Sequence, residues 1–452
     1  MIRPPIGPQG VGSGGLWAGE GSDRAQRHIA KTYRKDRAQR QGAKQTMKLN
    51  PHYRLFDGNM FVQMRALLAD LVPPAGRTLL DMSIGEPQIA AGDLLTRSML
   101  AHNDGWQFYP KAKGHPRFTQ AVDSYIGRRW PAAAGLVDLE RQMLPVPGTR
   151  EPLGLIGGLV KGAKTNAVAL VANPYYHAWR AGALASDGDI RYLNAHADSG
   201  FVPDLAAQPD DVLARTSIVY LCSPTNPQGG VMSLAQIKSA ITLARTHDFL
   251  LVMDECYCDI WRGAPPAGAL EAAASLHADE SGDASLDPLR NLVILNSLSK
   301  RSSAAGLRAG FMIGDASIMA LYLKVIANTG SLVPTPLLLA AADLYEDDEH
   351  VAVIRAHYDR SFALATRHLG VAPPPGGFFL WLPVADDRQF ARRLMQEQAV
   401  CAMPGSFMAE VSEGINPGAG YVRMALVHDH DRTEESLARV AALYDMDSRG
   451  AA

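Results

Sequence analysis

The feature that most constrains the fold is the alternation, from residue 47 onward, of short apolar runs with stretches of helical periodicity. Segments 151–161 and 234–246 are among the helical stretches. Strands that alternate with helices favour an α/β domain whose central sheet is mainly parallel and flanked by helices. Six runs have the length and composition of buried strands: 79–83, 167–172, 217–221, 250–254, 292–296 and 309–313. After Pro334 and Pro336 come long helical stretches, and then 376–381, which predicts a strand of a smaller domain.

The composition excludes several classes of protein. A chain of 452 residues, 47% of them hydrophobic, is long enough for two or three domains and a large core. Its 44 basic and 46 acidic residues nearly balance, so we expect neither a nucleic-acid partner nor a membrane partner. The longest apolar stretch, 153–172, is interrupted by Lys161 and Lys164. There is no signal-peptide pattern, and four cysteines in so long a chain fit reduced thiols in a cytoplasmic protein.

Residues 1–46 differ from the rest of the chain. Gly and Pro dominate to about residue 22, and a segment rich in Arg and Lys follows, with nine basic and three acidic residues in all. Such a segment has few large apolar side chains to bury, so we expect a disordered basic extension or an upstream start before Met47. The glycines at 10–15 match a dinucleotide-binding pattern, but no strand precedes them and no helix follows.

Reactive side chains stand at or just after the ends of two of the predicted strands. Lys300 comes directly after 292–296, with Ser297 before it and Arg308 after it. A lysine amine can form a Schiff base with an aldehyde, and hydroxyl and guanidinium groups bind phosphate oxygens. Pyridoxal 5'-phosphate carries both an aldehyde and a phosphate. Its pyridine nitrogen needs a carboxylate partner, which Asp254 provides at the end of another strand. Because open parallel sheets bind ligands at the carboxyl ends of their strands, the sequence predicts one site for this cofactor.

These motifs resemble those of the fold-type I, pyridoxal-phosphate-dependent class I and II aminotransferases. The resemblance runs from Gly85-Glu86-Pro87 to Tyr421-Val422-Arg423 and covers most of residues 47–445. It implies a large cofactor-binding domain, 86–336, and a small domain built from both chain ends, 47–85 and 337–452.

The resemblance also implies roles for individual residues around the cofactor ring. Lys300 would carry the Schiff base, and Asp254 would face the pyridinium nitrogen. Tyr257 and Asn226 match donors to the phenolic oxygen, and Tyr176 matches the aromatic side chain stacked on the ring.

Other matches concern the anionic groups of cofactor and substrate. The phosphate contacts would come from Gly148, Thr149, Ser297 and Arg308. Arg423 matches the arginine that binds the substrate's α-carboxylate, and Gly85 matches a backbone contact to the same group. Tyr109 matches a tyrosine that reaches the phosphate of a neighbouring subunit, so the resemblance implies a homodimer with shared active sites.

The resemblance implies transamination between an L-amino acid and a 2-oxo acid in two half-reactions at one site. By the same resemblance, Lys300 would act as the base that moves the α-proton. Within the family, the motifs are most similar to those of the succinyldiaminopimelate aminotransferases, which implies glutamate as donor and N-succinyl-2-amino-6-oxopimelate as acceptor. The chain departs from that branch at Ala304-Ala305, at Gln228 where threonine more often follows the proline, and in 262–290, which we interpret as a surface excursion. A distal carboxylate would meet Arg301, Arg150, Lys111 or Lys113, each of which is equally explained as surface charge.

Two other functions share this scaffold. A pyridoxal-phosphate lyase or decarboxylase would keep Lys300, Asp254 and Arg308. A transcriptional regulator with an aminotransferase-like domain would need a helix-turn-helix domain before residue 47, and that segment is short and rich in glycine. Neither His428-Asp429-His430 nor Cys256-Tyr257-Cys258 has the spacing of a metal site, so none is predicted.

Overall fold

The computed structural model describes residues 56, 58–90, 92–279, 286–329 and 331–448, with the side chains placed up to residue 444. All helices and strands given below lie in one compact unit, Gly58–Ala452. The predictions for residues 1–46 lie outside the described residues.

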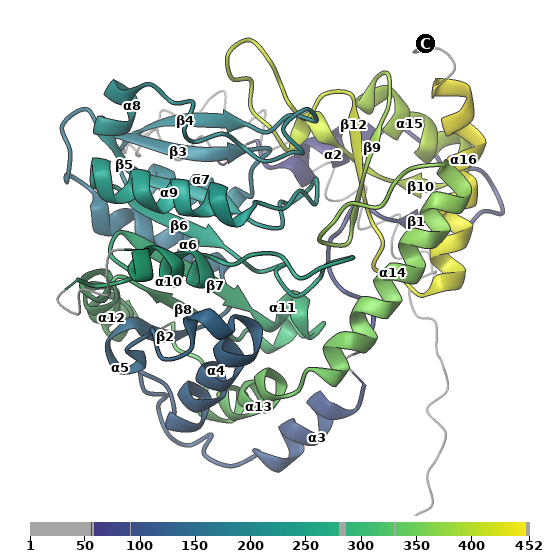
Figure 1. The fold of residues 1–452 in the computed structure, drawn as a ribbon. Coiled ribbons are helices and arrows are strands. Elements are labelled where there is room, and N and C mark those ends of the chain that lie inside the picture. Colours follow the sequence, from purple (N-terminus) through teal and green to yellow (C-terminus); the bar gives the residue numbers. More distant parts are fainter. Residues whose placement is uncertain (1–55, 57, 91, 280–285, 330, 449–452) are drawn as a thin grey trace, which may run out of the picture. The chain divides into compact units, whose positions relative to one another are not determined.

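The centre of this unit is a seven-stranded sheet with the strand order β2-β8-β7-β6-β5-β3-β4 (Figure 1). Strands β4, β3, β5, β6 and β7 run parallel, and β8 pairs antiparallel with both β7 and β2. The strand bounds are β2 Met143–Val146, β3 Val168–Asn173, β4 Asp189–Asn194, β5 Thr216–Cys222, β6 Leu250–Asp254, β7 Leu292–Ser297 and β8 Gly310–Gly314. Every residue of β3, β5, β6 and β7 is buried, because helices cover both faces of a parallel sheet. The predicted α/β fold with a mainly parallel sheet is confirmed.

Helices fill the connections between these strands. Their bounds are α3 Leu94–Ala101, α4 Pro116–Arg129, α5 Leu139–Gln142, α6 Arg150–Leu155, α7 His177–Ala185, α8 Asp210–Arg215, α9 Leu234–His247, α10 Ala269–Asp279, α11 Leu298–Arg301, α12 Ala316–Thr329 and α13 Thr335–Glu346. The start of α9 shows why such boundaries fall where they do. Ser233 accepts a hydrogen bond from the Gln236 amide, and the Gln236 side chain accepts one from the Ser233 amide. This capping box satisfies two amides that the helix itself leaves free.

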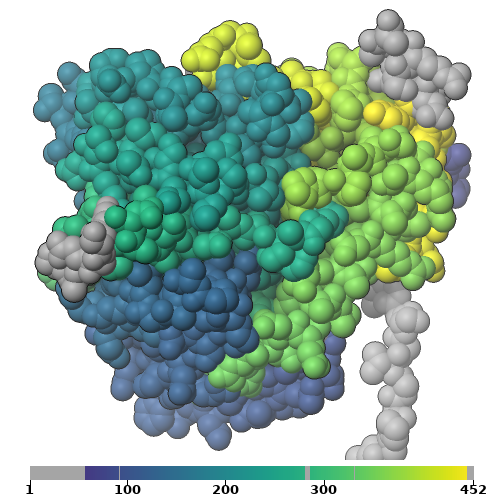
Figure 2. All heavy atoms as spheres, in the orientation of Figure 1, coloured from purple at the N-terminus to yellow at the C-terminus, as the bar shows by residue number. Residues whose placement is uncertain are grey.

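A second group of elements lies beside the large sheet, and its C-terminal elements are green to yellow in the space-filling view (Figure 2). Three antiparallel strands have the order β11-β12-β9, and a separate parallel pair joins β1 to β10. The bounds are α2 Met60–Leu68, β1 Leu80–Asp81, α14 Glu349–Leu369, β9 Phe379–Pro383, α15 Asp387–Gln398, β10 Val400–Cys401, β11 Met403–Pro404, β12 Tyr421–Ala425 and α16 His430–Ser448. A hydrophobic cluster separate from that of the large sheet unites Leu80 and Met82 with residues of these C-terminal elements.

The structure refines several expectations about elements. Strands β2 and β4 were not among the predicted runs. Helix α13 contributes Leu338, Leu344 and Tyr345 to the core of the large sheet. The division of the chain at residues 85/86 and 336/337 stays a prediction.

The interpretation of 262–290 as a surface excursion is wrong for its described part. Helix α10 lies within it, and Leu270 and Ala273 are fully buried in the main core. Small alanines let this helix pack against α9, and the buried carboxylate of Glu255 accepts a hydrogen bond of 2.6 Å from the amide of Ala269 at its start.

Candidate functional site

A cavity of about 550 Å³ lies where β5, β6 and β7 end. Because these strands are parallel neighbours, their last residues, Cys222, Asp254 and Ser297, reach the same edge of the sheet. The cavity is lined by Met60, Phe61, Ile84, Gly85, Glu86, Thr149, Arg150, Tyr175, Tyr176, His177, Trp179, Cys222, Asn226, Asp254, Cys256, Tyr257, Ser299, Lys300, Ala305, Gly306, Arg308, Phe379, Met408 and Arg423. We call it the first cavity.

Lys300 enters the first cavity from the short helix α11, which follows β7 directly. The Ser297 hydroxyl caps this helix by accepting a hydrogen bond from the Ser299 amide. The Lys300 Nζ donates to the Gly85 carbonyl oxygen at 2.7 Å. Burial lowers the pKa of the Lys300 amine from its ordinary value of 10.5 to about 8. The amine is therefore available in its uncharged, nucleophilic form close to neutral pH.

Asp254 is 4% exposed at the end of β6 and faces two donors. The indole Nε1 of Trp179 donates to its Oδ2 at 3.1 Å, and the amide of Cys256 donates to its Oδ1 at 3.2 Å. Burial raises the pKa of the Asp254 carboxyl, and the Trp179 and Cys256 donors oppose that rise. The arrangement holds a carboxylate at the bottom of the cavity, as a partner for a protonated ring nitrogen requires.

Tyr257, Asn226 and Arg423 form a chain of polar contacts on another wall. The Asn226 Nδ2 donates to the Tyr257 hydroxyl at 3.4 Å, and the Arg423 Nη1 donates to the Asn226 Oδ1 at 3.5 Å. Arg423 Nη2 donates to the Ser83 carbonyl oxygen at 2.7 Å.

The guanidinium of Arg423 is nearly fully buried and only partly paired. The residue is 3% exposed, its Nε has no hydrogen-bond partner among the described residues, and burial lowers its pKa to about 10. A buried cation with an unused donor favours an anionic ligand, because a carboxylate would supply both the charge and the missing acceptor.

A second arginine, Arg308, also lines the first cavity. Arg308 has a left-handed backbone with φ 54° and donates to the carbonyl oxygens of Ala305 and Pro147, each at 2.9 Å. Gly148 lies against it: a Cβ on Gly148 would come within 2.5 Å of the Arg308 Nη2. The hydroxyl-bearing residues Thr149 and Ser299 line the same cavity. Hydroxyls and a guanidinium are suited to phosphate oxygens.

Aromatic side chains from the start of α7 form a third wall. Tyr176 accepts a hydrogen bond of 3.0 Å from the Arg150 Nε, and burial raises the pKa of its phenol. The Tyr176 ring lies 4.3 Å from that of His177, whose pKa is lowered to about 4 by burial and by the nearby charge of Arg150.

Nine of the twelve residues predicted for the site line the first cavity: Gly85, Thr149, Tyr176, Asn226, Asp254, Tyr257, Lys300, Arg308 and Arg423. Gly148 lies behind Arg308. Ser297 is 1% exposed and does not line the cavity. Its hydroxyl lies within hydrogen-bond distance of the Ala309 carbonyl oxygen and of the Ser299 hydroxyl, and Ser299 does line the cavity. Tyr109 is 98% exposed and contributes nothing to the cavity of its own chain.

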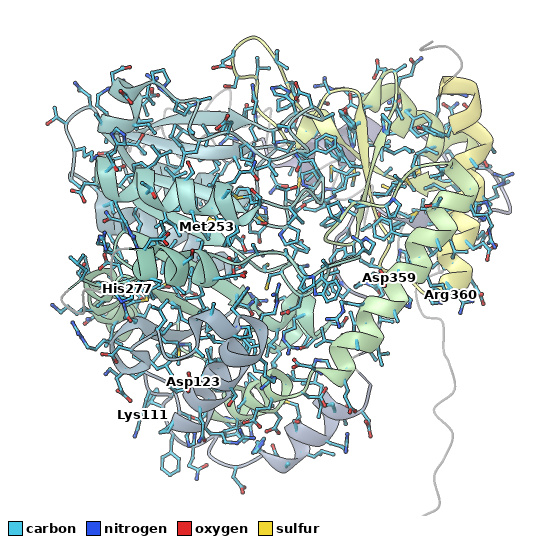
Figure 3. All side chains as sticks on the ribbon, in the orientation of Figure 1. Lys111, Asp123, Met253, His277, Asp359 and Arg360 are labelled. Carbon is cyan, nitrogen blue, oxygen red and sulfur yellow. The ribbon has the colours of Figure 1, made fainter. Side chains whose placement is uncertain are left out.

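Of the four basic residues considered as partners for a distal carboxylate of the substrate, the structure brings one to the cavity. Arg150 lines the cavity, whereas Arg301 is 2% exposed and ion-paired with Asp259 and Asp348. Lys113 contacts Glu140, and Lys111 lies at the periphery, below α4 (Figure 3).

Sequence reasoning did not identify Trp179 or Ser299. The Trp179 contact joins residues 75 positions apart and has no local pattern that signals it. Ser299, in contrast, directly precedes Lys300 in the sequence, and this position could have indicated that its hydroxyl lies close to the cofactor.

These residues fit pyridoxal 5'-phosphate. The amine of Lys300, the carboxylate of Asp254, the phenol of Tyr257 and three guanidiniums face one cavity, which has the size of an ordinary cofactor site. The orphaned Nε of buried Arg423 and the close approach of Gly148 to Arg308 are the observations that most directly call for anionic ligands.

Comparisons with known proteins agree on the family. A model of the family described as aminotransferase class I and II matches residues 77–440. The chain is 28% identical to 4-dedimethylamino-4-oxo-anhydrotetracycline transaminase OxyQ of Streptomyces rimosus, over 80% of this chain and 93% of the relative. It is 27% identical to LL-diaminopimelate aminotransferase of Syntrophobacter fumaroxidans, over 88% and 97%. An aminotransferase structure from Neisseria meningitidis Z2491 superposes with a TM-score of 0.79 at 32% identity and covers 86% of this chain and 97% of its own.

Proposed function

Because the chain belongs to the class I and II aminotransferase family, we propose that it binds pyridoxal 5'-phosphate in the first cavity and exchanges an amino group between an L-amino acid and a 2-oxo acid. The observation that carries the proposal is the convergence of a buried amine of lowered pKa, Lys300, with the buried carboxylate of Asp254 and the half-paired guanidinium of Arg423. When bound, the cofactor would act as an electron sink for the substrate's Cα electrons.

Each of the other steps is assigned to particular side chains of the cavity. Arg423 binds the α-carboxylate of the amino acid, which fixes the Cα–H bond within reach of Lys300. Lys300 then removes the proton from Cα as a general base, and a pKa of about 8 suits this task near neutral pH. Asp254 remains ionised and keeps a proton on the ring nitrogen. Tyr257 and Asn226 orient the ring, and Arg308, Thr149, Gly148 and Ser299 hold the phosphate, with Ser297 supporting Ser299.

For the substrates we propose glutamate as amino donor and an acidic 2-oxo acid as acceptor, with N-succinyl-2-amino-6-oxopimelate as the specific candidate. Arg150 supports an acidic substrate, since its Nε donates to Tyr176 while its other guanidinium N–H groups have no hydrogen-bond partner among the described residues. Several relatives are named LL-diaminopimelate aminotransferase, and such a substrate also carries a distal carboxylate.

We further propose a homodimer with shared active sites in the cytoplasm. Four large apolar side chains are exposed on α3 and the segment after it: Leu100, Trp106, Phe108 and Tyr109. Exposed apolar patches of this kind mark interfaces. The four cysteines are free thiols, as expected in a reducing compartment. Among the described residues, no helix has the length and apolar character needed to cross a bilayer.

A panel of amino donors against 2-oxo acids tests the proposed function. We expect glutamate to be converted to 2-oxoglutarate, and the visible spectrum to change to that of the aminated cofactor in the absence of an acceptor. Acidic acceptors should outperform apolar ones of equal length. Release of CO₂ or elimination products without the aminated cofactor would instead identify a decarboxylase or lyase.

A further inference from the structure

The residues at and after the end of β3 are hydrogen-bonded to the loop after β11 beside the first cavity. The Tyr175 amide donates to the Met408 carbonyl oxygen at 3.0 Å. The Asn173 side chain, in a fully buried residue, donates to the Glu410 carbonyl oxygen at 2.8 Å and accepts from the Glu410 amide at 3.1 Å. We call the junction of Asn173 and Tyr175 with Met408 and Glu410 the seam.

The seam forms one wall of the first cavity, because Tyr175 and Met408 both line it. The two halves of this wall come from different sheets. Asn173 ends β3 in the large sheet, whereas Met408 follows β11 in the small antiparallel sheet. A wall built from two such separate segments keeps its shape only while the segments are held together.

Arg180, from α7, holds the two halves of the seam together. Its Nη1 donates to the Tyr175 hydroxyl oxygen and to the Glu410 Oε1, each at 2.7 Å. The Tyr175 hydroxyl in turn donates to the same carboxylate oxygen at 3.3 Å. The side chain of Arg180 is 12% exposed and that of Glu410 is 39% exposed, and neither belongs to the described residues that line the first cavity. One guanidinium therefore fixes both halves of the wall from outside the cavity.

We propose that Arg180 and Glu410 are positioning residues for substrate binding in the first cavity, an inference that rests on the proposed amino transfer. Their ion pair holds Tyr175 and Met408 in the arrangement that the substrate meets. Without the pair, the wall has to be ordered as the substrate binds, and this ordering lowers the affinity. The contacts of Lys300 do not involve the seam, so the rate of proton removal and the retention of the cofactor stay unchanged.

The half-reaction of the cofactor-loaded protein with the best amino donor of the panel separates affinity from rate when it is followed by stopped-flow absorbance. In Arg180→Leu, we expect the donor concentration for half-maximal rate to rise roughly fivefold. The maximal rate constant and the dissociation constant of the cofactor should change by less than about twofold. Glu410→Ala should have the same effect, and the double variant should be no worse than either single variant, because the two side chains act as one pair.

Lys238→Leu is the matched control. Lys238 also bridges a hydroxyl and a carboxylate, those of Ser275 at 3.0 Å and Asp279 at 2.8 Å. It lies on α9 and is not among the described residues that line the first cavity. We expect native half-reaction kinetics. An equal loss of donor affinity in this variant would overturn the inference, since the loss of any ion pair would then weaken binding.

An unchanged half-saturating donor concentration in Glu410→Ala would also overturn the inference. This result decides the matter even if Arg180→Leu does not fold, because the Glu410 side chain is partly exposed. Losses that multiply in the double variant would show that the two side chains act separately, which contradicts a shared role. A native protein that transfers no amino group from any donor would overturn the proposed function and this inference together, whereas native turnover with native kinetics in Glu410→Ala would overturn this inference alone.

Discussion

At the scale of single residues, Lys300 is the group whose removal has the clearest consequence. Lys300→Ala takes away the only proposed base and covalent anchor, so we expect amino-group transfer to fall to background. Cofactor still binds through the phosphate contacts, but without the absorption band of its Schiff base. Steady-state assays and visible spectra measure the two effects. Lys111→Ala, at an exposed site outside the cavity, is the matched control and should behave as the native protein.

Because the pKa of Lys300 is lowered, the rate at which the cofactor-free protein captures its cofactor should depend on pH near neutrality. Only the uncharged amine attacks an aldehyde, and its fraction rises with pH through the pKa. With a pKa of about 8, the rate of cofactor capture should be half-maximal near pH 8 and level off above it. A rate that keeps rising to pH 10, toward the ordinary value of 10.5, would show that burial does not tune this amine.

Trp179 positions Asp254 and does not touch the reacting atoms in our proposal. Trp179→Phe keeps an aromatic ring but removes the donor to Asp254, so the burial that raises the carboxyl's pKa is opposed by one donor fewer. We expect kcat to fall roughly tenfold and the pH titration of the cofactor's absorbance to shift, as loss of a hydrogen bond to a charged group implies.

Trp130→Phe is a fitting control for this variant. Trp130 is also buried, at 2% exposed, but its indole N–H has no hydrogen-bond partner among the described residues. Similar losses of kcat in both variants would mean that ring packing, and not the donor to Asp254, matters.

At the scale of elements, Arg301 ties α11 to the start of α14. Its guanidinium pairs with Asp259 and Asp348 while only 2% exposed. Arg301→Ala would leave the buried Asp259 carboxylate with Arg129, 3.5 Å away, as its only ion-pair partner among the described residues, and we expect the free energy of unfolding to fall by roughly 3 kcal/mol in urea titrations.

Arg128 offers a matched comparison because it pairs with the same Asp348 at the surface, with side-chain exposures of 39% and 55%. Arg128→Ala should cost no more than about 1 kcal/mol. Equal losses for the two arginines would contradict a structural role for the buried pair.

The sequence predicted elements best where one apolar run ends in a polar residue. Strand β6 has the predicted bounds, and Asp254 stands at its end. Strand β2 escaped prediction because Pro145 interrupts a short run at the antiparallel edge of the sheet, and β4 because its residues alternate in exposure at the other edge. The burial of Arg301 could not be predicted, since its partners come from distant segments. Local spacing locates strand ends, whereas long-range pairing decides which neighbouring side chain faces the cavity.

At the scale of the whole molecule, the exposed apolar residues on and after α3 predict self-association. Replacing Trp106, Phe108 and Tyr109 together by Ser removes most of the patch without disturbing the core, because all three are more than half exposed. We expect the native protein to sediment as a dimer and the triple variant as a monomer with little activity. A native protein that is monomeric and fully active at assay concentration would refute the shared site.

The pairing of β1 with β10 has a consequence for synthesis on the ribosome. Leu80 leaves the exit tunnel early, yet its partner Val400 follows roughly 320 residues later, which takes tens of seconds at about 5–20 residues per second. Once β8 has been synthesised, the seven strands of the large sheet can assemble, while Leu80 and Met82 still lack the apolar neighbours that the last C-terminal elements supply. A nascent chain stalled before residue 400 should therefore expose this early segment to chaperones and proteases, and release of the last fifty residues should end that vulnerability.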